Sequence, residues 1–80
     1  NGFSIERGLT TPDSAEAAVK RAFVAAARTK VLLTDHTKFG LNHFAQVADL
    51  AEIDVIISDT SLTDQAVAEI AEAGPKVVRA

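Results

Sequence analysis

Polar side chains follow two apolar runs of this 80-residue sequence, at the points where the runs stop. The run Val31–Leu33 is followed by Thr34-Asp35-His36-Thr37-Lys38, and Val55–Ile57 is followed by Ser58-Asp59-Thr60-Ser61. An ammonium group and a carboxylate at such a place can bind the phosphate and hydroxyl oxygens of a small ligand. Asp35 can equally cap a turn by accepting hydrogen bonds from the next amides, and an exposed Asp–Lys pair contributes only ~0–1 kcal/mol. The residue types alone favour capping, because polar residues at strand ends are the rule.

No motif for catalysis or metal binding accompanies these residues. His36 and His43 are seven positions apart across a glycine, which is not a zinc-ligand spacing, and the sequence has no cysteine. It also contains no GxSxG, P-loop or GxGxxG pattern. A phospho-accepting receiver domain also carries an Asp at a strand end, but its magnesium-binding acidic pair has no counterpart in "ERGLTTPD". We therefore predict no catalytic residue, no metal ligand and no cofactor.

The charge balance limits the partners of this segment. Eight Lys and Arg are scattered among eleven Asp and Glu, for a formal net charge of −3. Because DNA affinity depends on clustered basic residues, these 80 residues are not expected to bind nucleic acid by themselves. No apolar run approaches the roughly 18 residues of a membrane span, so we expect a cytoplasmic protein without membrane contact.

Three strands are predicted, at about Lys30–Thr34, Asp54–Ser58 and Lys76–Arg79. The first two are continuous apolar runs, which is typical of parallel strands buried on both faces. The segments between the strands predict right-handed crossovers and one parallel α/β sheet. Ligands bind beyond the carboxyl ends of the strands in such sheets, where Asp35, Lys38 and Asp59 would lie.

Two helices and several connections complete the expectation. A helix should begin at Asp13, which forms a capping-box-like pair with Glu16, and a second should begin at Thr63 and end at Gly74-Pro75. Apolar residues recur at helical spacing in the first helix, with Glu16, Lys20 and Arg28 off the stripe: Ala15, Ala18, Val19, Ala22, Phe23 and Ala26. Residues 2–11 read as a loop, residues 44–47 as either a short strand or a helical turn, and residues 49–52 as a capped turn.

Four motifs in order resemble one protein family. They are Gly8-Leu9-Thr10, Glu16-Ala17-Ala18-Val19-Lys20-Arg21-Ala22, Asp35-His36-Thr37-Lys38-Phe39-Gly40 and Ile53-Asp54-Val55-Ile56-Ile57-Ser58-Asp59. Together they cover nearly the whole chain and are similar to the second half of the effector-binding domain of DeoR-type transcriptional repressors. The resemblance implies a Rossmann-like, three-layer parallel half-sheet of the ribose-5-phosphate-isomerase-like fold, and a homo-oligomeric protein.

The resemblance also changes the interpretation of the strand-end residues. It implies a phosphorylated sugar or related metabolite as the effector, with Lys38 and Asp35 as ligand-binding residues and Thr10 as a weaker candidate. Phe39 would anchor the turn from behind, and Gly40 would let the chain leave. The alternative on the same fold is a sugar-phosphate isomerase, but Gly2-Phe3-Ser4-Ile5 offers no acid where such enzymes carry paired carboxylates.

The same resemblance implies that the chain is a fragment. The family's phosphate-binding Gly-Thr-Thr loop and its winged helix-turn-helix both belong to segments that precede the matched motifs. We therefore expect residues 1–80 to be one part of a sensor domain, with DNA bound only through the missing N-terminal domain.

Overall fold

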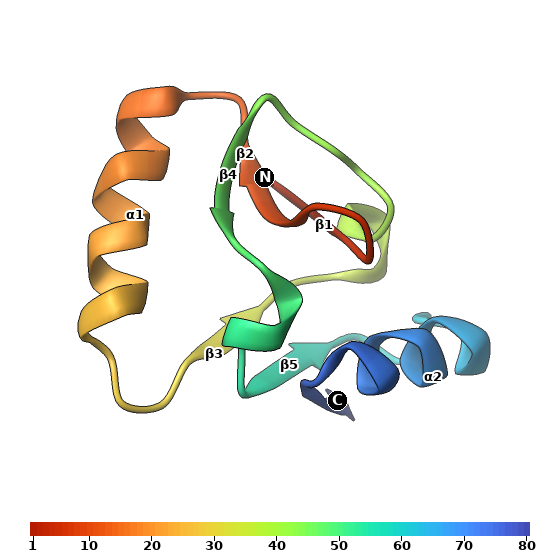
Figure 1. The fold of residues 1–80 in the computed structure, drawn as a ribbon. Helices are drawn as coiled ribbons and strands as arrows, with labels where there is room; N and C mark the ends of the chain where they lie inside the picture. Colours follow the sequence, from red (N-terminus) through yellow and green to blue (C-terminus); the bar gives the residue numbers. More distant parts are fainter.

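The computed structural model describes all residues 1–80 and distributes its strands between two three-stranded sheets (Figure 1). The antiparallel sheet has the order β1-β2-β4 and consists of β1 (Gly2–Ser4), β2 (Gly8–Thr11) and β4 (Ala45–Ala48). The parallel sheet has the order β3-β5-β6 and consists of β3 (Val31–Leu33), β5 (Val55–Ser58) and β6 (Lys76–Arg79).

The parallel sheet confirms the three strands predicted from the apolar runs. Leu32 of β3 is paired with Ile56 of β5, and Ile56 is paired with Val77 of β6, all in parallel register. The central strand is the best covered, because Ile56 is completely buried. The outer strand β3 is not, since Val31 and Leu33 expose 52% and 74% of their surface. The α/β class is therefore correct, whereas a sheet covered on both faces is not seen.

The antiparallel sheet corrects the expectation of a loop at residues 2–11. That segment forms a hairpin in which Phe3 faces Leu9, and β2 then pairs with β4. Glycines and hydroxyl residues gave these short strands a turn-like composition. Their extended form depends on pairing with a segment more than thirty residues away and on burial of Phe3 and Thr10, which local sequence does not report.

Both helices begin where the caps predict. The Asp13 carboxylate accepts hydrogen bonds from the Ala15 and Glu16 amides at the start of α1 (Ser14–Ala26), and the Thr63 hydroxyl accepts one at the start of α2 (Asp64–Ala73). Short 3₁₀ turns, η1 (His36–Lys38) and η2 (Leu50–Glu52), follow β3 and β4. Helix α1 packs against β4 and β2, and α2 packs against β6. Neither helix has the length and apolarity that crossing a bilayer requires.

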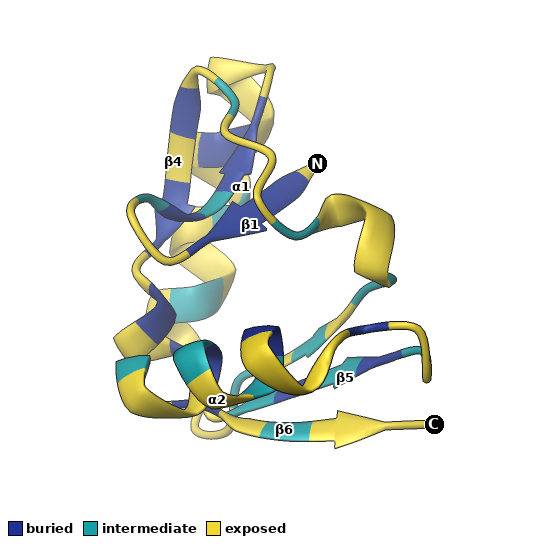
Figure 2. Ribbon diagram, turned by 90° about the vertical axis from the view of Figure 1, so that its right-hand side faces the viewer, coloured by how far each residue is buried: buried dark blue, intermediate teal, exposed yellow.

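The orientation of α1 differs from the one its apolar stripe suggests. Val19 and Phe23 on that stripe are 55% and 70% exposed, whereas Ala17 is completely buried and Val24 is partly buried. Most of the α1 ribbon is coloured as exposed (Figure 2). The helix therefore packs on the antiparallel sheet through Ala17 and Val24 and leaves Val19 and Phe23 largely uncovered. Exposed large apolar side chains that lie together on a small domain mark a surface that another protein segment can cover.

We expect the isolated chain to self-associate. The apolar stripe of α1 that contains Phe23 is exposed, as is Leu33, and β3 lies at an edge of the parallel sheet with no strand on its outer side. Phe23→Lys combined with Leu33→Lys should shift the population toward monomer in sedimentation velocity at high micromolar concentration. Ala25→Lys combined with Ala68→Lys adds the same charge at exposed helix positions away from the stripe and from β3, and should leave association unchanged. A clean wild-type monomer at that concentration would contradict the expectation.

The conformation and surroundings of Gly8 explain why the Gly-Leu-Thr motif begins with glycine. Its φ is +70°, and a Cβ added there would lie 2.0 Å from the Ala48 carbonyl oxygen of the neighbouring strand. Gly40 also has a positive φ, +87°, but a Cβ added there would meet nothing within 4 Å. A substitution at Gly8 would therefore cause both backbone strain and a steric clash, whereas a substitution at Gly40 would cause backbone strain alone.

Gly8→Ala should lower the free energy of unfolding by about 2 kcal/mol or more, because strain and clash add. Gly40→Ala should cost about 1 kcal/mol, from the left-handed conformation alone. Urea denaturation followed by circular dichroism measures both. Equal losses for the two variants would show that Ala48 moves away at no cost.

Candidate functional site

The turn after β3 is held at its start by Asp35. Its carboxylate accepts hydrogen bonds from the Thr37 amide at 2.9 Å and from the Thr37 hydroxyl, and its carbonyl oxygen accepts one from the Lys38 amide at 3.1 Å. The Thr37 hydroxyl, the Thr37 amide and the nearby Lys38 charge together lower the pKa of Asp35 below its ordinary value of 3.8. Asp35 therefore has the capping role that the residue types favoured, and these hydrogen bonds fix the backbone position of Lys38.

A second carboxylate, from the neighbouring strand, holds the same turn. Asp59 directly follows β5, and its Oδ1 accepts a hydrogen bond from the His36 amide at 3.0 Å while its Oδ2 lies 2.6 Å from His36 Nδ1. The side-chain hydrogen bond with His36 is the main cause that lowers the pKa of Asp59. The sequence placed both residues at one sheet edge, but it did not indicate that they pair with each other.

The turn is anchored from behind by aromatic contact with the other sheet. The Phe39 ring packs on the Phe3 ring of β1, with 5.2 Å between centroids, and the Gly40 amide donates to the Phe3 carbonyl at 2.8 Å. The positive φ of Gly40 then turns the chain away. The structural roles expected for Phe39 and Gly40 are thus confirmed.

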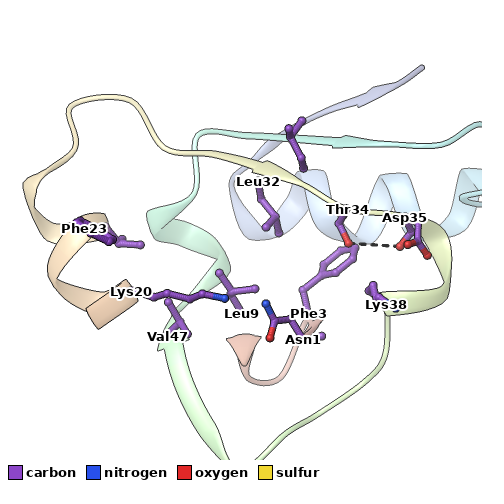
Figure 3. A pocket seen from close by; sticks show the side chains of 13 residues that line it. Asn1, Phe3, Leu9, Lys20, Phe23, Leu32, Thr34, Asp35, Lys38 and Val47 are labelled. Atoms are coloured by element: carbon purple, nitrogen blue, oxygen red, sulfur yellow. Dashed lines mark hydrogen bonds between the residues drawn. The ribbon is translucent and has the colours of Figure 1, made fainter. Parts of the chain in front are cut away.

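A cavity of about 580 Å³ lies between the two sheets, and residues of this turn line it (Figure 3). Such a volume is typical of sites for small metabolites. Its polar wall contains Thr34, Asp35 and Lys38 on the β3 side and Lys20 from α1. Its apolar lining consists of Phe3, Leu9, Phe23, Val24, Leu32, Leu33 and Val47. The structure therefore brings Asp35 and Lys38 together at one cavity, as a ligand site requires.

Thr10 lies elsewhere. It is completely buried in β2, outside the cavity lining, and its hydroxyl accepts a hydrogen bond from the His43 amide at 3.0 Å and donates to the Gly2 carbonyl. These bonds tie the long segment after the turn to the hairpin. Thr10 therefore has a structural use in the chain, and the geometry gives no support to a ligand role for it.

Lys20 is the cavity residue that sequence reasoning missed. It lies off the apolar stripe of α1, and its spacing was not taken to indicate a ligand role. Since α1 turns Ala17 and Val24 toward the antiparallel sheet, Lys20 at the intervening position reaches the cavity rim. The spacing Ala17, Lys20, Val24 is itself a helical face, and reading it as the inner face would have found this lysine.

The chain is similar to the sensor domains of transcription regulators. Residues 1–60 match the family described as the DeoR C terminal sensor domain, and the chain belongs to that family. It is 42% identical over 78 residues to the HTH-type transcriptional regulator GlpR of Haloferax volcanii, which is 98% of this chain and 31% of that regulator.

Two further relatives are named as repressors. The HTH-type transcriptional repressor GlcR of Bacillus subtilis is 39% identical over 54 residues, covering 68% of this chain and 21% of that repressor. The deoxyribose operon repressor of Escherichia coli K12 is 33% identical over 64 residues, covering 80% of this chain and 25% of that repressor. The chain thus spans about a third or less of the length of these curated relatives.

The pairing of His36 with Asp59 predicts an acid-side transition of the turn. Because native hydrogen bonds lower the pKa of Asp59, they stabilise the folded turn above the ordinary Asp pKa of 3.8 and are lost as pH falls through the lower native value. The carboxyl ¹³C resonance of Asp59 should therefore titrate with a midpoint below 3.8. In His36→Ala the midpoint should rise toward 3.8, and an unchanged midpoint there would show that His36 is not the cause.

Proposed function

We propose that this chain forms part of the effector-binding region of a DeoR-type repressor. The effector would be a phosphorylated sugar or a related metabolite, and its binding would control DNA binding by a winged helix-turn-helix outside this sequence. Membership of the sensor-domain family and the regulator names of the relatives support the regulatory class. The effector class is supported by the chemistry of the cavity.

One observation carries the proposal: Lys38 reaches a cavity of metabolite size with its ammonium group uncommitted. The three ion pairs of the molecule involve other residues, so no carboxylate lies within ion-pair distance of Lys38. The hydrogen bonds that Asp35 and Asp59 accept hold the turn at its backbone, on the N-terminal side of Lys38. A lysine presented in this way can donate to phosphate oxygens. The Asp35 carboxylate beside it can accept from sugar hydroxyls.

The isomerase alternative is less well supported. Proton transfer between neighbouring sugar carbons needs a carboxylate positioned as a general base. Asp35 is the one carboxylate in the cavity lining, and hydrogen bonds from Thr37 together with Lys38 lower its pKa. A lower pKa makes it a weaker base. The relatives described above are named as regulators, which agrees with binding without turnover.

The uncovered surfaces support the interpretation of the chain as one part of a larger sensor domain. Leu33 at the sheet edge and Phe23 on α1 would be covered if β3 were an inner strand of a wider ribose-5-phosphate-isomerase-like sheet. The relatives are about three times longer or more, which leaves room for further sheet strands and a DNA-binding domain. Homo-oligomer formation, as expected from the family resemblance, belongs to the same proposal.

Lys38→Met in the full-length parent protein should weaken binding of the preferred member of a panel of pentose and hexose monophosphates. A charged hydrogen bond is worth about 1.5–3 kcal/mol, so the loss should be roughly 10- to 150-fold in affinity by isothermal calorimetry. Folding should hardly change, because methionine keeps the long apolar stem and Lys38 is exposed. The variant should repress normally but respond poorly to inducer.

Lys76→Met is the matched control, since Lys76 is an exposed lysine of β6 that does not line the cavity. It should bind the same sugar phosphate as the wild type does. Unchanged affinity in Lys38→Met would leave Lys38 as an ordinary turn lysine. A wild-type protein that binds no member of the panel would contradict the effector class itself.

A further inference from the structure

We infer that Lys20 is a second anion-binding residue of this cavity, so that the effector carries an anionic group at each of its two ends. The inference rests on the proposed function and deepens it. Sugar bisphosphates and phosphorylated sugar acids are the chemical classes that fit. The argument uses the position of Lys20, its present partner and the distribution of charge along the lining.

The two lysines of the lining approach the cavity from different elements. Lys38 belongs to the turn after β3, whereas Lys20 belongs to the middle of α1 (Figure 3). In the close view the Lys20 side chain extends toward Leu9 and Asn1, and Lys38 stands on the other side of Phe3 beside Asp35. Apolar side chains therefore separate two cationic points, which is the arrangement that an elongated ligand with charged ends requires.

The charge of the lining is not balanced at the α1 end. Lys38 has Asp35 nearby, and the two charges interact enough for Lys38 to lower the pKa of Asp35. The carboxylate nearest to Lys20 is Glu16, whose Oε1 lies 2.7 Å from Lys20 Nζ, but Glu16 is not part of the lining. A ligand with one phosphate at Lys38 would leave the Lys20 end of the cavity without an anion.

The ion pair between Lys20 and Glu16 is of the kind that a ligand can replace. It joins positions i and i+4 on a helix surface, with the side chains 34% and 45% exposed, and such pairs contribute little to stability. On the cavity side, Lys20 Nζ can instead donate to a phosphate or carboxylate of the ligand, and hydrogen bonds between charged groups are stronger than those between neutral groups. Glu16 therefore acts as a counter-ion that holds the lysine at the rim until an anionic ligand arrives.

The test compares fructose 6-phosphate with fructose 1,6-bisphosphate, which differ only in the second phosphate, by calorimetry on the full-length parent protein. The wild type should prefer the bisphosphate by about 10-fold or more, the effect of one charged hydrogen bond. Lys20→Met should remove this preference and leave monophosphate affinity nearly unchanged. Lys38→Met should weaken both ligands, which separates the two lysines.

Two further variants distinguish a binding role from a structural one. Lys20→Arg keeps the charge and should retain most of the preference for the bisphosphate. Glu16→Gln frees Lys20 and should tighten bisphosphate binding about twofold, the size of a surface i,i+4 pair. Thermal unfolding should be nearly the same for all these proteins, because the pair lost is exposed.

The failures of the two proposals are distinguishable. Equal wild-type affinity for the two fructose phosphates, or equal weakening of both by Lys20→Met, would overturn the role of Lys20 while a loss on Lys38→Met still supports the effector site. Failure of the wild type to bind either fructose phosphate would also overturn the inference. Failure to bind any sugar phosphate of the wider panel would overturn the proposed function.

Discussion

The contact between Phe3 and Phe39 is the constraint on which the site depends. The antiparallel sheet and the parallel sheet share no strand, and the cavity exists because the two are held at a fixed separation. The contact of the two tilted rings, together with the hydrogen bond from the Gly40 amide to the Phe3 carbonyl, joins β1 to the turn after β3. Phe3 is almost completely buried, so its ring serves both as core and as cavity wall.

The parts of the fold that the sequence predicts are those whose signals are local. Continuous apolar runs around Leu32 and Ile56 identified parallel strands, and Asp13 and Thr63 identified helix starts, because a cap is recognised within three residues. The hairpin was missed because its pairing with β4 is a long-range event. The face of α1 was reversed for a related reason: its larger apolar residues, such as Phe23, are not covered within this chain.

The residues of the candidate site also divide into those that local patterns indicate and those that depend on tertiary packing. Asp35 and Lys38 were proposed because the strand end and the family resemblance coincide on them, and both residues line the cavity. Thr10 was proposed from its motif, yet its hydroxyl is occupied by His43 and Gly2. Lys20 and the His36–Asp59 pair were missed because they depend on how α1 rotates and on how closely two strand ends approach. The spacing of Ala17, Lys20 and Val24 is compatible with an inner face of α1, but only the packing of the helix shows that this face is the inner one.

The two-point attachment of the η1 turn has a thermodynamic consequence. Asp35 fastens the turn from its own strand and Asp59 fastens it from the next, so the backbone that carries Lys38 is ordered before any ligand is present. A ligand that binds there pays for few newly immobilised torsions, chiefly those of the lysine stem. Binding at this turn should therefore show a small entropic penalty, and the free energy of the contact is available to distinguish one metabolite from another.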